Sequence, residues 1–199
     1  MLKLAIPYRD RDDHLKKFSI EGIKFLEECG IPYKLIIVEQ AEGELFNLGK
    51  LTNIGFDLFR KEGFSEEDSY IYQPVDCIPF DVDYEAPRGG VVKLTRPDEN
   101  KFYKSFSIDP EVYEKINGIT NKCWGWGGED ENFFFRLDTW SITVERRAMD
   151  FEELPHGHDC QHNPNNLGKV KEIDGLDTLE YTIIEETERY GITTFVCKI

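Results

Sequence analysis

The stretch Leu2-Lys-Leu-Ala-Ile-Pro7 is an apolar run of strand length, and a helical pattern follows it at Asp12–Cys29. Two further apolar runs, Tyr33–Val38 and Tyr70–Val75, flank a second helical pattern at Asn47–Phe64. The spacing of the apolar residues separates the strands from the helices. Because strands and helices alternate, the sequence predicts an α/β fold with a mainly parallel central sheet flanked by helices.

The remainder of the chain is less regular. We expect a strand at Gly90–Leu94, helices at Asp109–Ile116 and Glu129–Leu137, a loop at His162–Asn166 and a C-terminal β-hairpin within Glu180–Ile199. Ligands of parallel α/β sheets bind beyond the carboxyl ends of the strands. The strand ends at Pro7, Val38 and Val75 therefore predict where a site lies.

Length and composition narrow the class of protein. The 199 residues predict a single domain, 1–199, which we expect to be monomeric. A net charge of −15 argues against nucleic acid or an anionic membrane surface as a partner. Five cysteines without paired spacing indicate reduced thiols. With no apolar run long enough to span a membrane, we expect a soluble, cytoplasmic protein unless an anchor was removed.

The segment Asn121-Lys-Cys-Trp-Gly-Trp-Gly-Gly-Glu-Asp-Glu-Asn132 alternates tryptophan with glycine and ends in three acids. Glycine lets the backbone bend, and indole offers a flat face on which a sugar can stack. One of the carboxylates can take a proton from a sugar hydroxyl. The pattern is also compatible with a loop whose acids only favour the positive end of the next helix.

Two short motifs have the residue types of a metal site. Asp76 follows the third predicted strand, and His156 and His158 lie two residues apart, so that in an extended segment both face one side. Two imidazoles with a carboxylate suit a first-row transition metal. A turn aspartate and surface histidines explain the same residues without a metal.

Other motifs offer cations and an aromatic ring for an anionic ligand. Arg9 and Arg11 follow the first strand, and Phe46 precedes the second long helix. Solvated basic residues and an ordinary helix cap remain the alternative. The sequence has no Gly-x-Gly-x-x-Gly, no P-loop and no Gly-x-Ser-x-Gly, so dinucleotide oxidoreductase, NTPase and serine hydrolase functions lack support.

These segments together resemble the β-1,4-galactosyltransferase family, which contains inverting enzymes of the GT-A fold. The motif Trp124-Gly-Trp-Gly-Gly-Glu-Asp130 resembles the family signature, and further segments follow in the family's order: Pro7–Arg11, Phe46–Phe56, Val75–Pro79, Ile116–Gly118 and Asp174–Leu179. The segment His156-Gly-His158 is most similar to the branch that transfers galactose to xylose. The resemblance runs almost from end to end of the chain.

The resemblance implies a UDP-sugar donor, galactose as the transferred sugar, a glycan acceptor and Mn²⁺. It implies that Asp130 is the general base and that a metal is held by Asp76, His156 and His158. For the donor side it implies Pro7, Arg9, Arg11, Phe46, Asp76 and Trp126, and for the acceptor Trp126, Glu129 and Glu131.

Three departures from the family pattern bear on donor recognition. Pro74 stands where the family has the first Asp of Asp-x-Asp, and Leu48 stands where it has an Arg. The family's Phe-Gly-Gly corresponds to Phe102-Tyr-Lys104. Two other functions therefore stay open: a sugar-binding module that has lost transfer, and a metal-dependent hydrolase.

Overall fold

The computed structural model describes residues 1–96, 104–155 and 162–199. An eight-stranded sheet has the order β7-β5-β6-β3-β1-β2-β10-β9. Pairs β1–β2, β1–β3, β2–β10 and β5–β7 are parallel, and the other three pairs are antiparallel. The predicted α/β fold with a mainly parallel sheet is confirmed. The strands are β1 (Leu2–Tyr8), β2 (Tyr33–Gln40), β3 (Ser69–Tyr72), β5 (Gly90–Thr95), β6 (Ser105–Ile108), β7 (Thr143–Ala148), β9 (Thr182–Arg189) and β10 (Ile192–Lys198).

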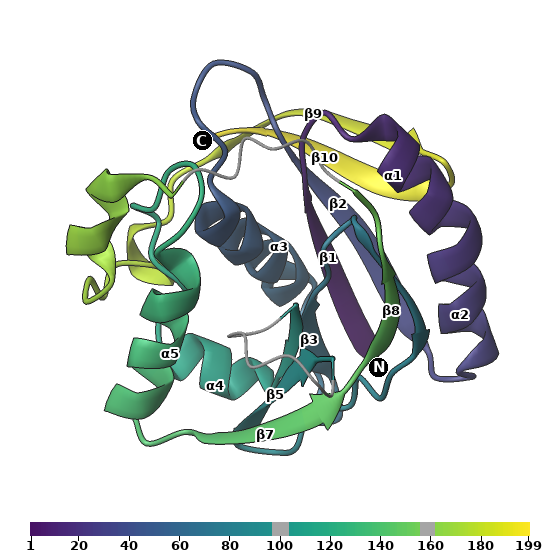
Figure 1. The fold of residues 1–199 in the computed structure, drawn as a ribbon, viewed down its shortest axis with the longest axis horizontal. Helices are drawn as coiled ribbons and strands as arrows, with labels where there is room; N and C mark the ends of the chain where they lie inside the picture. The colour runs from purple at the N-terminus through teal and green to yellow at the C-terminus, as the bar shows by residue number, and fades with distance from the viewer. Residues whose placement is uncertain (97–103, 156–161) are drawn as a thin grey trace.

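Helices cover both faces of this sheet (Figure 1). One apolar cluster joins the strands to the long helix α3 and to α4 and α5, and two others join the opposite face to α1 and α2. All seven residues of β1 are buried because this central strand is covered on both sides. The helices are α1 (Asp12–Lys17), α2 (Ile23–Glu28), α3 (Leu48–Glu62), α4 (Pro110–Lys115) and α5 (Glu129–Thr139).

The first predicted helix contains a π-helical turn, Phe18–Gly22, between α1 and α2. The Phe18 ring lies over Gly22, where an added Cβ would come within 3.0 Å of it. The second predicted helix begins as expected, because the side chain of Asn47 accepts a hydrogen bond from the Lys50 N–H at 2.9 Å. It ends at Glu62, two residues before the predicted end, and the C-cap Gly63 has a φ of +95°.

The third predicted strand is shorter than expected, because β3 ends at Tyr72 and Pro74 has no N–H to extend the ladder. The predicted loop at His162–Asn166 is wrong in part, since the 3₁₀ helix η2 spans Pro164–Lys169 and another, η3, spans Leu176–Thr178. The C-terminal hairpin is confirmed, with positive φ at Tyr190 and Gly191 in its turn.

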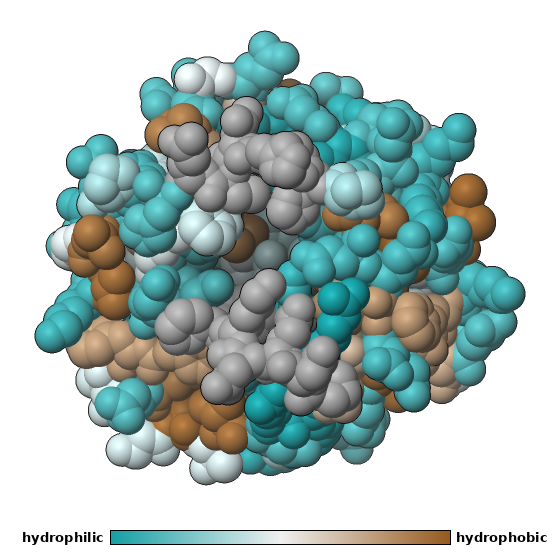
Figure 2. Space-filling view, in the orientation of Figure 1, coloured by the Kyte–Doolittle hydropathy of each residue, from teal (hydrophilic) through white to brown (hydrophobic). Residues whose placement is uncertain are grey.

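A separate two-stranded sheet pairs β4 (Cys77–Asp81) with β8 (Asp150–Glu153) beside the third strand's end. The view of Figure 2 shows a mainly hydrophilic face, in agreement with the net charge of −15. Cys29, Cys77, Cys123 and Cys197 are free thiols, as expected, and Cys160 lies outside the described residues. Within the described ranges, no helix combines the length and apolar character that crossing a bilayer requires.

Candidate active site

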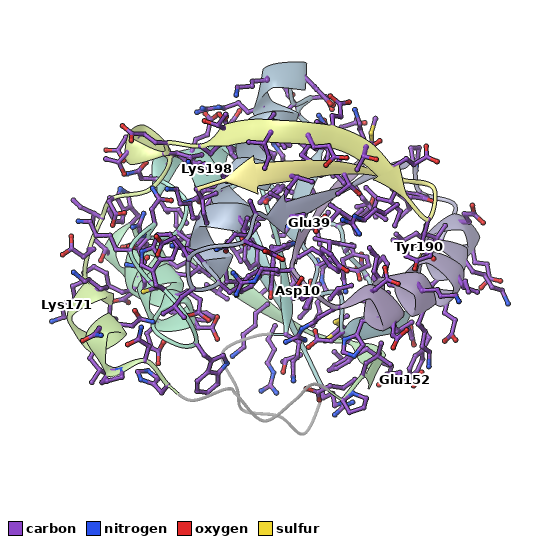
Figure 3. All side chains as sticks on the ribbon, turned by 90° about the horizontal axis from the view of Figure 1, so that it is seen from above. Asp10, Glu39, Glu152, Lys171, Tyr190 and Lys198 are labelled. Carbon is purple, nitrogen blue, oxygen red and sulfur yellow. The ribbon has the colours of Figure 1, made fainter. Side chains whose placement is uncertain are left out.

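A cavity of about 640 Å³ lies beyond the carboxyl ends of β1 and β3, where the sequence predicted a site. Asp10, one of its lining residues, lies near the middle of the view in Figure 3. The predicted site residues that line the cavity come from four segments distant in the sequence: Pro7, Arg9, Arg11, Phe46, Asp76, Trp126, Glu129 and Asp130. The fold therefore brings together eight of the residues predicted separately.

Two arginines follow β1 and are held by different partners. The Arg9 guanidinium donates a hydrogen bond to the Glu44 carbonyl at 2.7 Å and lies 5.5 Å from the Phe46 ring centroid. Arg11 forms an ion pair with Asp76, with Nη1 and Oδ2 3.0 Å apart. Both cations line the cavity, where they could meet an anionic ligand.

Asp76 follows β3 in the turn before β4, and its carbonyl accepts a hydrogen bond from the Leu154 N–H at 2.8 Å. Its carboxylate is largely buried and already binds one cation, Arg11. The predicted partners His156 and His158 lie outside the described residues. Within the described part of the chain, no group of three or more His, Cys, Asp and Glu side chains is arranged to hold a metal.

The Trp-Gly loop is fixed by backbone hydrogen bonds on both sides. The Gly125 N–H donates to the Phe46 carbonyl at 2.7 Å, and the Asn163 N–H donates to the Trp126 carbonyl at 2.9 Å. The Trp126 indole stays 53% exposed at the cavity and meets the His162 ring edge-on, at 6.0 Å between centroids. An exposed indole that lines the cavity is a platform for a sugar ring.

Three acids begin α5 but differ in their surroundings. Glu129 is 7% exposed, and its Oε2 is buried without a hydrogen-bond partner among the described residues. Burial and then the charge of Asp130 raise the pKa of Glu129 to about 8. Asp130 lines the cavity and is only partly buried. The predicted acceptor ligand Glu131 is not among the residues lining the cavity; its carboxylate accepts a hydrogen bond from the Gly128 N–H at 3.1 Å.

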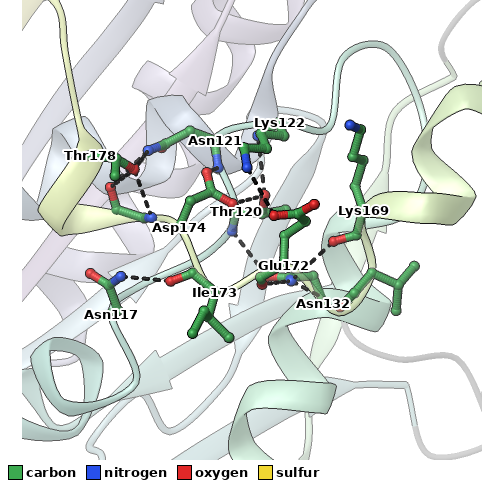
Figure 4. Close-up of polar contacts among 12 residues, drawn as sticks. Asn117, Thr120, Asn121, Lys122, Asn132, Lys169, Glu172, Ile173, Asp174 and Thr178 are labelled. Carbon is green, nitrogen blue, oxygen red and sulfur yellow. Dashed lines mark hydrogen bonds and ion pairs between the residues drawn. The ribbon is translucent and has the colours of Figure 1, made fainter.

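The start of α5 is held in place by a buried polar network that the sequence analysis did not identify (Figure 4). The Asn132 side chain links the Thr120 N–H to the carbonyls of Val170 and Glu172. The fully buried Arg136 guanidinium joins α5 to the loops on either side. Asn132 and Arg136 lie four residues apart on the apolar face of a predicted helix, which is the signal that could have identified them.

Residues at which the chain departs from the family pattern also line the cavity. Leu48, Pro74 and Lys104 contribute to its wall, and Lys104 forms an ion pair with Glu153 of β8. Glu153 and Tyr72 line the cavity too, although the sequence analysis did not select them. Tyr103 lies outside the described residues.

Comparison with known proteins gives the same family from two independent segments. The model described as "N-terminal region of glycosyl transferase group 7" matches residues 2–85, and that described as "N-terminal domain of galactosyltransferase" matches residues 102–162. The chain belongs to the β-1,4-galactosyltransferase family. The predicted family is therefore confirmed.

Curated members of the family align with nearly the whole chain. The chain is 32% identical to β-1,4-galactosyltransferase 6 of Rattus norvegicus over 90% of its length, and 32% identical to xylosylprotein 4-β-galactosyltransferase of Caenorhabditis elegans over 73%. It spans about half the length of these curated relatives, 52% and 53% respectively.

Solved structures confirm the fold. The catalytic domain of Drosophila β-1,4-galactosyltransferase 7, solved with xylobiose, superimposes with a TM-score of 0.83 at 24% identity, covering 100% of this chain and 93% of the other. A mutant of that protein was solved with manganese, UDP-Gal and xylobiose. A mannosyltransferase of Pyrobaculum calidifontis superimposes over 79% of this chain with a TM-score of 0.54 at 9% identity.

Proposed function

We propose that this chain is the catalytic domain of a manganese-dependent glycosyltransferase, in which residues 1–199 form one domain that acts as a monomer. It transfers galactose from a UDP-sugar to a sugar hydroxyl of a glycan, with inversion at the anomeric carbon. The observation that supports this proposal best is the cavity at the ends of β1 and β3, which gathers the residues expected for donor, acceptor and base. Membership of the galactosyltransferase family supports the same chemistry.

The donor side is formed by Arg9, Arg11 and Phe46 together with Pro7. Two guanidinium groups offset the charge of a diphosphate in a protein whose net charge is −15. Phe46, which already stacks near Arg9, provides an apolar wall beside the nucleotide. Trp126 contributes an exposed indole between donor and acceptor.

Of the three proposed metal ligands, Asp76 is the one that lies within the described residues. Its carboxylate lines the cavity and binds a guanidinium, so the position favours a cation. With His156 and His158 it provides the carboxylate and imidazole donors that manganese accepts. A metal bound there would neutralise charge on the departing diphosphate.

The three acids of α5 have different roles in this proposal. Asp130 takes the proton from the acceptor hydroxyl as its oxygen attacks the anomeric carbon. Glu129 is protonated at neutral pH because its pKa is near 8, and it can therefore donate a hydrogen bond to the acceptor. Glu131 is assigned to the acceptor by the family resemblance alone, because its carboxylate caps the helix at the Gly128 N–H and is not among the residues lining the cavity.

Thermal unfolding of the protein with UDP, UDP-galactose, UDP-glucose and UDP-N-acetylglucosamine, each with and without Mn²⁺, tests the proposal. A ligand at a hundred times its Kd stabilises the folded state by about 2.7 kcal/mol. We expect a rise in the unfolding temperature that requires both nucleotide and manganese. We also expect sugar transfer when glycan acceptors are added to the same samples.

The other two functions predict different results. A sugar-binding module binds glycan in the absence of UDP, and it releases no UDP from a UDP-sugar. A metal-dependent hydrolase prefers zinc and acts in the absence of UDP. Absence of any shift with all four nucleotides in the presence of Mn²⁺ would refute the transferase proposal.

A further inference from the structure

A second cavity, of about 440 Å³, lies beside the proposed active site. Leu45 lines both cavities, and Gly125, which lines the first, has Leu45 and Asn163 of the second within 3.8 Å of an added Cβ. The two cavities are therefore neighbours across the Trp-Gly loop. A chain of sugars that enters the first cavity can extend into the second.

The wall of this second cavity includes Trp124, whose backbone is held in place by side chains. The Trp124 carbonyl accepts hydrogen bonds from the side-chain amides of Asn163 at 2.7 Å and Asn166 at 3.1 Å. The Trp124 N–H donates to the Asn166 Oδ1 at 3.2 Å. Because the backbone is held before any ligand arrives, little conformational entropy is lost when a sugar stacks on the half-exposed ring.

The charged side chains that line this cavity are Lys122, Lys169 and Glu44. Lys122 pairs with Glu172 at 2.8 Å, but both side chains are well exposed, at 47% and 38%. Such surface pairs contribute little stability, so a ligand anion can compete with Glu172 for the ammonium. Figure 4 shows Lys169 and Lys122 near Glu172.

The backbone of Lys169 is held by the network that supports the active site. The Asn132 side-chain amide donates to the Lys169 carbonyl at 3.5 Å and to the Val170 carbonyl at 2.9 Å. Asn132 itself belongs to α5, which carries Glu129 and Asp130. The backbone that carries the Lys169 side chain is therefore held relative to the proposed base.

We propose that the second cavity binds an acidic group, carboxylate, sulfate or phosphate, on the acceptor sugar next to the one that receives the transferred hexose. Lys122 and Lys169 pair with the anion, Trp124 stacks on the ring, and Glu44 with the Asn165 amide meets hydroxyls. This inference rests on the proposed function and narrows it to acidic glycan acceptors.

The test compares binding of matched neutral and acidic disaccharides in the presence of UDP and Mn²⁺. The neutral probes are xylobiose, which is bound in the related Drosophila structure, and cellobiose. The acidic probes are both disaccharides carrying a sulfate or a phosphate on the second sugar, and cellobiose whose second sugar is oxidised at C6 to a uronate; these arms identify the source of the charge. Isothermal titration calorimetry at 50 mM and 300 mM salt measures affinity.

We expect at least one acidic probe to bind about three- to tenfold more tightly than its neutral counterpart at low salt, as two exposed charge pairs allow. The double variant Lys122→Gln/Lys169→Gln should abolish this preference and leave neutral binding unchanged. Lys171→Gln is the matched control, because Lys171 is exposed, does not line the cavity and lies at the periphery in Figure 3. The control variant should change neither the affinity for the neutral probes nor the preference for the acidic ones.

Equal or weaker binding of every acidic probe, or an equal loss in the control variant, overturns the inference. The manganese-dependent shift with UDP-sugars is measured separately on the same protein. If that shift is present and the acidic preference is absent, only this inference fails. If the shift itself is absent, the proposed function fails.

Discussion

Replacing the buried Arg136 by methionine tests how the active-site helix is held in the fold. The guanidinium is fully buried and donates five hydrogen bonds, which connect α5 to the loops before and after it. Its acceptors are the Asn132 side chain and the carbonyls of Ile116, Asn117, Glu172 and Asp174. Methionine fills similar space but donates none of these bonds.

The expected cost follows from two opposing effects. Each bond from a charged donor contributes about 1.5–3 kcal/mol, so five would exceed the whole stability of many domains if they were additive. Removing the buried charge also relieves its desolvation, which costs several kcal/mol. Deleting one side of a buried charged network leaves a net loss of about 3–5 kcal/mol. We expect that loss for Arg136→Met.

Urea unfolding measures the change. With a slope of about 2 kcal/mol per M for a protein of this size, the midpoint should fall by about 2 M. Arg88→Lys is the control, because Arg88 is 53% exposed and its replacement should change stability by less than about 0.5 kcal/mol. A loss below about 1 kcal/mol in Arg136→Met, with a normal control, would show that the network does not hold the helix.

Three further predictions concern the loop and the acids of the site. Asp130→Asn should lower kcat by a factor of about 10²–10⁴ and leave the thermal shift with UDP and Mn²⁺ unchanged, as a general base requires; near-normal turnover would remove the assignment. The Glu129 carboxyl has its pKa raised from 4.5 to about 8, so its contribution to stability is complete below pH 4.5 and is lost as the pH rises through 8. In urea titrations at pH 5 and pH 9, Glu129→Gln should therefore gain stability relative to the wild type at the higher pH, and a constant difference would contradict this. Gly127→Ala should lower the free energy of unfolding by about 1–3 kcal/mol and weaken acceptor binding. Gly127 has a φ of +94°, and an added Cβ would lie 2.4 Å from the His162 ring. The control Gly168→Ala, which has open space around it, should be neutral.

The sequence was sufficient to predict the layers of the fold, the family, and eight of the residues that line the cavity. Strand and helix periodicity depends on local backbone geometry, so the alternation from Leu2 to Val75 predicts the parallel core directly. The Trp-Gly-Glu-Asp motif identified the family because its residue types are rare in combination. What local patterns missed were the short strands β4, β6, β7 and β8, for which pairing over long distances along the chain decides the structure.

Only the tertiary structure decided which neighbours each functional residue has. It paired Arg11 with Asp76 and buried Glu129 where its pKa rises. It also placed the two lysines of the second cavity beside Trp124. The Arg11–Asp76 pair and the second cavity join segments far apart in the chain, and the pKa of Glu129 depends on burial, which no linear pattern specifies.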